Sequence, residues 1–555
     1  MMRFLPDAAV ALLVLISLGW GGHAPWSMFA LELGASVLLL CVLLSVLWTN
    51  DPETSWRKIP PGTGYRGLAS LVRVLSLGLL PWGRKAAAIE MLPAGRQLPA
   101  PDEDVDSCGI AGYRFPRARV AVPLFFLTLW IAASLLPLPG DWLRSLSPRA
   151  LSIRAASESL LRFETVTAWT WSLAPFLTER ALCLWTAYLA LFYVGVSLAA
   201  DPKRVRRLSG LLFMAAVAAG SYGVWQWFSG LRDLLVVAPS LSGTRASGPF
   251  GNPNHYAAAM EILLLCSAGW MGARLMQVAG DSMPGLLSRA RGLQQESVAK
   301  FALMGLGMIA AALGLIFSLS RSGITATVAA LGVFALLGSS RLGASRADVI
   351  ELKRHPGEAS ARAPREAGAC RVWAFSFCLA AITIWIGMGP LVQRFGGVST
   401  VWEVEKGRQQ VWLDSLGAVR DFWLTGSGLG SYQHVFPIYR TFGGDQSYAY
   451  AHNDYLQLLI ELGLPGVLLV SWLGVAVCLA ARRARRRLRD DVASLHLHAG
   501  YCAAAFAIAL HSFTDFSLHL PANAALLSVV LGVVVGFDRE RDAAKRISLA
   551  RGPVG

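Results

Sequence analysis

The sequence predicts an all-α, polytopic membrane protein, and three observations carry that prediction. Of the 555 residues, 54% are hydrophobic and only 15% are charged, and the mean hydropathy is +0.49. This composition leaves too few polar side chains to cover several soluble domains. Apolar runs long enough for a bilayer, which takes about 20 helical residues to cross, recur throughout the chain. We therefore expect about 12 transmembrane helices, with one large loop between the ninth and the tenth.

The expected spans are joined mostly by short connections. The first apolar run is short enough for a signal peptide, but no cleavage site of small residues follows it, so we interpret it as a retained helix. The spans are expected at 6–21, 27–48, 119–138, 181–200, 208–228, 255–278, 301–320, 323–340, 372–390, 455–481, 497–516 and 523–537.

Basic residues are distributed unevenly over these connections. With the N-terminus inside, the inside segments hold 37 of the 50 Lys and Arg residues. The positive-inside rule then predicts that both termini are cytoplasmic and that the loop 391–454 lies on the opposite side. The net charge of +15 and the basic run 482–489 are explained as topology signals beside membrane lipid, so we expect no nucleic-acid partner.

Two larger segments divide the chain into three regions. We expect an N-terminal transmembrane region at 1–240 with a cytoplasmic insertion at 49–119, a catalytic region at 241–480 that includes the loop 391–454, and a C-terminal helix pair and tail at 481–555. The eight cysteines include no C-x-x-C pair, and none lies in the larger outer loops. The sequence therefore predicts neither a disulfide framework nor a zinc site, and we expect no metal and no cofactor.

Three charged or titratable residues lie at the expected outer membrane face. Charge there costs free energy, so each residue is expected to have a partner or a function. Arg245 precedes a turn-rich stretch, and Arg321 separates two apolar runs. His452 falls where the outer loop becomes the tenth helix. A helix N-terminus beside His452 would favour a neutral ring that can accept a proton. Solvated or snorkelling arginines and a structurally bonded histidine are the alternatives.

Six further residues are weaker candidates for substrate binding. Arg408 opens a segment with helical apolar spacing, which indicates either packing or sugar recognition. Glu461 lies at hydrocarbon depth and either pairs with another helix or faces a cavity. His511 and Asp515 are expected one turn apart on a helix, where they either line an acceptor entrance or make a structural hydrogen bond. The six are Asn254, Arg408, Asn453, Glu461, His511 and Asp515.

Together these residue types suit one kind of chemistry. Two guanidiniums match the oxygens of a diphosphate, because each offers a fork of donors. A neutral histidine suits deprotonation of a hydroxyl nucleophile. The implied reaction transfers a group from a lipid diphosphate to an alcohol.

The second half of the chain also resembles a known family, the bacterial O-antigen ligases and O-antigen polymerases. The resemblance rests on four pieces in order: R-x-x-G-x-F-G-N-P-N at 245–254, S-R-S-G at 320–323, GRQQVWLDSLGAVRDFWLTGSGLGSY at 407–432 and HNDYLQLLIELGLPG at 452–466. It implies a fold similar to other all-helical, polyprenyl-dependent glycosyltransferases (GT-C-like). It also implies a bacterial inner membrane location, with the active site facing the periplasm.

The resemblance implies a metal-independent, inverting transfer of glycan from undecaprenyl diphosphate. Arg245 and Arg321 would hold the diphosphate and His452 would help to activate the acceptor. The acceptor is a glycan on another lipid-linked repeat, the lipid A core, or a protein hydroxyl, and no residue decides among these.

Two readings of a different kind stay open at this point. A membrane transporter would also have twelve spans with charges inside them, although the two halves of the chain show no similarity to each other. A cytoplasmic transferase that uses nucleotide sugars would need a metal site. The candidate ligands for such a site are the acidic residues of the run 102–106.

Overall fold

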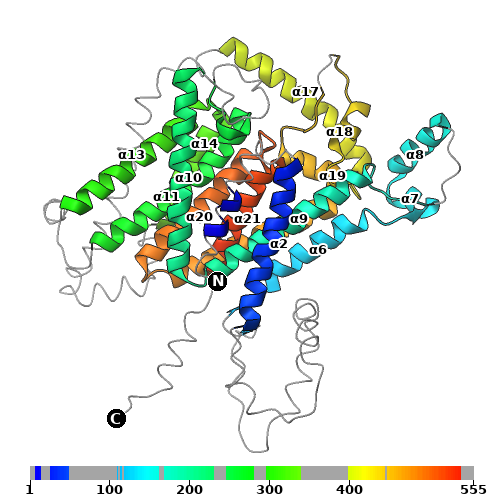
Figure 1. Cartoon of the computed structure of the whole chain (residues 1–555). Coiled ribbons are helices and arrows are strands. Elements are labelled where there is room, and N and C mark those ends of the chain that lie inside the picture. The colour runs from blue at the N-terminus through cyan, green and yellow to red at the C-terminus, as the bar shows by residue number, and fades with distance from the viewer. Residues whose placement is uncertain are drawn as a thin grey trace, which may run out of the picture.

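The computed structural model describes residues 7–9, 11–13, 25–48, 109–110, 113–114, 118–161, 168–230, 245–279, 295–338, 398–443 and 447–538. Helices dominate these residues (Figure 1). They are α2 (Pro25–Trp48), α6 (Ala118–Ala133), α7 (Gly140–Leu146), α8 (Pro148–Leu161), α9 (Pro175–Leu198), α10 (Pro202–Ser229), α11 (Pro253–Ala279), α13 (Gln295–Phe317), α14 (Arg321–Gly338), α17 (Val398–Phe422), α18 (Tyr432–Val435), α19 (Asp454–Arg487), α20 (Val492–His511) and α21 (Pro521–Gly536).

Short elements complete the described chain. The 3-10 turns are η3 (Gly248–Phe250), η5 (Phe436–Ile438) and η6 (Ser517–His519). Two antiparallel pairs of two-residue strands occur, β1 (Gly109–Ile110) with β2 (Tyr113–Arg114) and β3 (Leu138–Pro139) with β4 (Ala168–Trp169). Gly109 faces Arg114 in the first pair, and Leu138 faces Trp169 in the second.

Seven helices among the described residues are long and apolar enough to cross a membrane, namely α9, α10, α11, α13, α14, α19 and α20. Shorter apolar helices occur in α2, α6 and α21. The mostly helical, multi-span fold is thus confirmed, whereas the total of 12 spans stays a prediction. The expected span 372–390, most of the span 6–21 and most of the insertion 49–119 lie outside the described residues.

Local capping explains where several spans begin. The run expected at 497–516 forms a helix that begins and ends five residues earlier, at Val492 and His511. The carboxylate of Asp491 accepts from Ser494 N at 3.1 Å and so caps the first turn. Likewise Asp201 caps α10, which therefore includes the basic segment 201–207. Polar caps rather than the edges of apolar runs set these boundaries.

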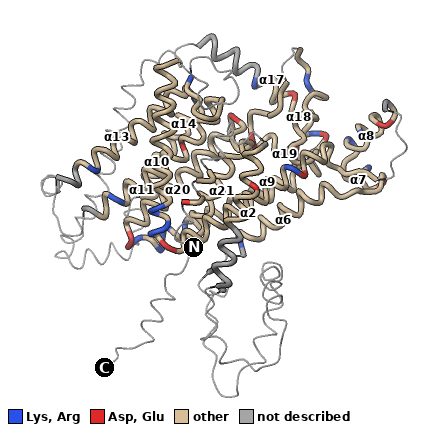
Figure 2. Tube along the Cα trace, in the orientation of Figure 1, with Lys and Arg blue, Asp and Glu red and all other residues tan. Residues whose placement is uncertain are grey.

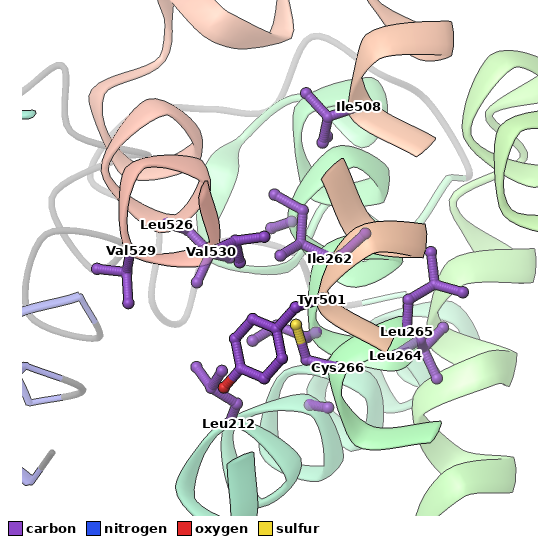
Figure 3. Close-up of a cluster of buried hydrophobic side chains, with 14 of the residues drawn as sticks. Leu212, Ile262, Leu264, Leu265, Cys266, Tyr501, Ile508, Leu526, Val529 and Val530 are labelled. Carbon is purple, nitrogen blue, oxygen red and sulfur yellow. The ribbon is translucent and has the colours of Figure 1, made fainter. Parts of the chain in front are cut away.

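The core lies between α10, α11, α20 and α21, and Figure 3 shows part of it around Tyr501 and Cys266. The Tyr501 ring is fully buried, and its hydroxyl lies 3.0 Å from that of Ser209 on α10. Helices α11 and α20 approach closely because small residues meet: a Cβ atom at Gly500 would lie 2.8 Å from the Cα of Gly269. Such small-residue contacts let membrane helices pack without large apolar side chains between them.

An outer layer covers one end of this bundle. It is formed by α17, α18, β3, α7, α8 and residues 168–173. Its buried aromatic residues include Trp171, Phe422 and Tyr432. Polar contacts add to the packing: the Arg149 side chain lies 3.2 Å from Asp421 at the end of α17. The outer loop predicted at 391–454 is therefore an ordered helical layer from residue 398 onward, apart from residues 444–446, which lie outside the described part.

Basic residues gather at the opposite end of the bundle (Figure 2). There α19 ends in an arginine-rich turn, and α10 begins with a Lys-Arg cluster. Arg483 and Arg487 both reach Asp538, with N···O distances of 2.8 and 3.5 Å. The basic run 482–489 thus takes part in helix-end pairing within this protein, in addition to the topological role that the sequence predicts.

Candidate active site

Most of the polar residues singled out from the sequence lie where helices begin or end, at the same end of the bundle as α17 (Figure 1). Arg408 and Glu461 instead lie within α17 and α19. Helices α11, α14, α19 and α21 begin there, and α20 ends there. Their termini bring backbone donors and acceptors close to side chains that are distant in the sequence.

Arg245, Asn254 and Asp515 form a continuous chain of hydrogen bonds. Arg245 Nε donates to the carbonyl oxygen of Ser318 at 2.8 Å, and its Nη2 donates to Asn254 Oδ1 at 2.8 Å. The Asn254 amide then donates to Asp515 Oδ2 at 2.7 Å. The bonds at two nitrogens fix the plane of the guanidinium.

Asp515 is the centre of the cluster, and its side chain is only 1% exposed. Arg408 Nη2 lies 3.7 Å from Asp515 Oδ2, and Arg408 Nη1 donates to the carbonyl oxygen of Thr514 at 2.9 Å. Burial by itself would raise the pKa of this carboxyl. His452, Arg408 and the nearby rings of His255 and His511 instead hold the pKa of Asp515 well below its usual range. The carboxylate is therefore ionised and orders the cations around it.

His452 lies against the same carboxylate in a strained backbone conformation. Its φ is +52°, a left-handed value that non-glycine residues adopt at some cost. Its Nδ1 lies 3.8 Å from Asp515 Oδ1, which is too long for a hydrogen bond, and this nitrogen is buried without a hydrogen-bond partner among the described residues. The ring meets Phe516 edge to face at 4.8 Å.

The residues after His452 begin α19. Asn453 caps the helix, because its side-chain oxygen accepts from the backbone nitrogens of Tyr455 and Leu456 at 3.1 and 3.0 Å. Asn453, a candidate for substrate binding in the sequence, thus makes helix-capping bonds in the structure. The next residue, Asp454, bonds to His519 through Oδ1, at 2.8 Å from Nδ1.

Arg321 is the first residue of α14, as the sequence predicts for a junction between two apolar runs. The turn before it is tight, and Leu319 has a φ of +49°. Two neighbours in the chain tie this turn to the cluster: Ser318 accepts from Arg245, and Ser322 Oγ accepts from Thr514 Oγ1 at 2.8 Å. The S-R-S-G segment and the Arg245 segment are therefore brought together.

Glu461 does not face the cluster. Its Oε2 accepts from the backbone nitrogen of Gly430 at 2.8 Å, and its Oε1 accepts from that of Tyr432 at 3.1 Å and from Gln457 Nε2 at 3.0 Å. Of the two sequence alternatives, pairing with another element is the one observed, and that element is the glycine-rich outer loop.

The structure contradicts the expectation that His511 and Asp515 lie one turn apart on the same helix. Helix α20 ends at His511, and Thr514 N closes a turn on the His511 carbonyl at 3.0 Å, so Asp515 lies beyond the helix. His511 instead pairs through Nδ1 with Glu261 of α11 at 2.9 Å, and both side chains are fully buried.

Sequence reasoning missed three residues of this region. Glu261 was visible as an acid inside an apolar run, and Asp454 as an acid at a predicted helix start. His519 had no local signal, because its partner lies 65 positions earlier in the chain.

Comparison with known families bears on this arrangement. The O-antigen ligase family model matches residues 306–471. Residues 306–471 are thus similar to O-antigen ligases. No curated protein matches the chain. The O-antigen ligase region includes Arg321, Arg408 and His452, whereas Arg245 and Asp515 lie outside the match and join the site through the fold. Together with the apolar helices, the match supports a membrane enzyme of the glycan-transferring ligase or polymerase kind.

Proposed function

We propose that this protein moves a glycan from undecaprenyl diphosphate to an acceptor hydroxyl, as an O-antigen or exopolysaccharide polymerase or an O-antigen ligase. The observation that supports the proposal is the chain of bonds from Arg245 through Asn254 to Asp515, with Arg408 and His452 beside the same carboxylate. A cationic cluster at one end of a membrane bundle suits a lipid substrate whose charged group lies at the membrane surface.

Charge considerations assign the arginines to the donor. As the bond between the sugar carbon and the diphosphate oxygen breaks, negative charge develops on the departing diphosphate. Arg245 and Arg321 supply guanidiniums that bind phosphate oxygens in a fixed geometry. The orientation of Arg245 is set before the substrate arrives, because Ser318 and Asn254 already hold its guanidinium. Such preorganised donors contribute more to the rate than mobile ones.

The acceptor loses a proton as its oxygen bonds to the sugar carbon from the face opposite the diphosphate. We assign this proton to His452, which directly precedes the first turn of α19 and lies beside the Asp515 carboxylate. The proposal includes a periplasmic location for the site and inversion at the sugar carbon, as the sequence resemblance implies.

The test is mass spectrometry of undecaprenyl-linked glycans in a strain that lacks this protein, compared with its parent. Accumulated single repeat units indicate a polymerase, and accumulated long chains indicate a ligase or a protein O-oligosaccharyltransferase. If neither accumulates, the transferase proposal is wrong and a transporter becomes the better hypothesis.

Complementation makes the same test specific to the site. His452→Ala should reach the membrane but fail to restore transfer, since general-base assistance is typically worth about 10²–10⁴ in rate. His434→Ala is the matched control, because His434 is an exposed histidine of the outer layer on α18. Normal transfer by correctly inserted His452→Ala protein would contradict the assignment of the base.

A further inference from the structure

A second histidine–carboxylate pair lies close to the site and has the more complete geometry. His519 Nδ1 lies 2.8 Å from Asp454 Oδ1, whereas His452 Nδ1 lies 3.8 Å from Asp515 Oδ1. Only the first distance is a hydrogen bond. A base whose second ring nitrogen is held by a carboxylate has a fixed tautomer and orientation, which is what proton transfer from a hydroxyl requires.

The bond to Asp454 fixes which nitrogen of His519 carries the proton. Asp454 is the first residue of α19, and its Oδ2 accepts from Leu518 N at 3.3 Å. A carboxylate oxygen accepts hydrogen bonds, so Nδ1 of His519 is the donor. The Nε2 atom of His519 has no hydrogen-bond partner among the described residues, and the side chain is 22% exposed.

Aromatic contacts connect the two histidines. His519 contacts Tyr450 at a centroid distance of 5.1 Å, Tyr450 stacks on Phe516 at 4.4 Å, and Phe516 meets His452 at 4.8 Å. We call these four residues the aromatic row. At one end of the row, His452 lies 3.8 Å from Asp515, the carboxylate that Arg408 also approaches. The other end carries the His519–Asp454 pair.

We propose that His519, oriented by Asp454, is a second proton-accepting residue of the transferase, at the opposite end of the aromatic row from His452. This inference rests on the proposed function. When the acceptor oxygen bonds to the sugar carbon, the electron pair of the broken bond leaves with the diphosphate. The acceptor hydroxyl gives up a single proton. For an acceptor bound at the His519 end of the aromatic row, that proton passes to Nε2 of His519 instead of His452, directly or through one water, and is later released to solvent.

The surroundings of His519 tune its basicity. Burial opposes the charged ring, but the bond to Asp454 and the charges of Asp454 and Glu461 raise the pKa of His519 above its usual value. Tyr450 is the ring next to His519, and His255 of α11 contacts Phe516 further along the row at 4.6 Å. A histidine base must be neutral to act, so activity should fall as the pH drops through this raised pKa.

The experiment uses membranes from a strain that lacks the protein, which supply both donor and acceptor, together with the purified full chain. His519→Gln should lower the transfer rate about 10²-fold, the smaller effect expected of a general base. Asp454→Asn should move the acid limb of the pH–rate profile to lower pH by about one unit or more, because an opposite charge next to a histidine is removed. His434→Gln and Asp141→Asn, at exposed positions, should match the parent in both measurements.

Each outcome separates the two proposals. A His519→Gln rate within twofold of the parent would overturn the second-base proposal while leaving the transferase intact. A lower rate with an unmoved acid limb in Asp454→Asn would also overturn it, since a structural role does not shift a titration. If His519→Gln does not reach the membrane, the Asp454→Asn profile decides alone. No transfer by the parent protein would instead defeat the proposed function.

Discussion

The Asn254 amide uses both of its ends, donating to Asp515 and accepting from Arg245. A neutral residue thus bridges a cation and an anion without adding charge. Hydrogen bonds of this kind to charged groups contribute about 1.5–3 kcal/mol each.

Replacing Arg245 by Lys should remove most of the transfer activity. A lysine ammonium is a point charge and cannot donate to the Ser318 carbonyl and to Asn254 in the geometry of the guanidinium. If one such bond is lost from the transition state, the rate should fall at least about tenfold, which corresponds to about 1.4 kcal/mol. Transfer in membranes is the measurement.

The matched control for Arg245→Lys is Arg420→Lys, since Arg420 is an exposed arginine of α17. Equal activity of both variants and the parent would mean that Arg245 acts only through its charge or has no role in transfer.

The structure shows which of the residues singled out from the sequence lie together. Arg245, Arg321 and His452 stand out in the sequence because charge at a membrane face is costly, and the structure places Arg245 and His452 around one carboxylate, with the Arg321 turn bonded to Arg245. Glu461 stands out for the same reason, yet it serves the outer loop. The free-energy cost of placing a charge in the membrane identifies residues that need a partner. Which residue is the partner depends on the fold.

At the scale of elements, α19 is a broken helix. Gly463 has a φ of +63° and a ψ of −171°, so the helical path is interrupted between Asp454 and Arg487. The indole nitrogen of Trp130 donates to the Leu462 carbonyl at 2.8 Å and so satisfies one acceptor left by the break. The short first part of α19 carries the residues that follow His452.

Gly463→Ala should destabilise the protein strongly. Alanine disfavours a positive φ, and a Cβ atom at 463 would stand 2.7 Å from the backbone nitrogen of Gly426. We expect a loss of about 1–3 kcal/mol from backbone strain alone. Thermal unfolding in detergent is the measurement. The control is Gly474→Ala, at an open position within the same helix, which should be neutral or stabilising by up to about 1 kcal/mol. Similar melting of the two variants would argue against a required break.

The buried pair of Glu261 and His511 should behave as a matched unit that joins α11 to α20. His511→Leu leaves an unpaired acid in the bundle and should cost about 3–5 kcal/mol, whereas the double variant Glu261→Leu, His511→Leu should recover most of that loss. A double-mutant cycle of unfolding free energies measures this coupling. Additive losses would show that the two side chains contribute independently.

At the scale of the whole molecule, composition was a better guide to the fold class than local sequence patterns were to the outer layer and the helix ends. Mean hydropathy was sufficient to predict a mostly helical membrane protein, because no other structure satisfies backbone groups over so many apolar runs except a closed barrel. The ordered outer layer was not predictable in detail, since its contacts join β3, β4 and α17, which are far apart in the sequence. Helix ends were set by capping side chains such as Asp491 and by the break at Gly463.

The distribution of basic residues predicts the orientation of the chain. In a cysteine-free background, Gly443→Cys in the outer layer should react with a membrane-impermeant maleimide in intact cells. Arg489→Cys, near the basic end of α19, should react only after permeabilisation. Both positions are exposed, so differences in labelling report the side of the membrane. The reverse pattern would invert the proposed topology and place the site in the cytoplasm.

The way Glu461 holds the outer loop has a consequence for how this protein can diversify. Its carboxylate accepts from the backbone nitrogens of Gly430 and Tyr432, and every residue except proline offers such a nitrogen. These two hydrogen bonds to Glu461 therefore do not depend on the side chain at position 432. The exposed side chains that directly follow the loop, Gln433 and His434, can change during evolution while the loop stays attached to α19 and the helix bundle is left unaltered.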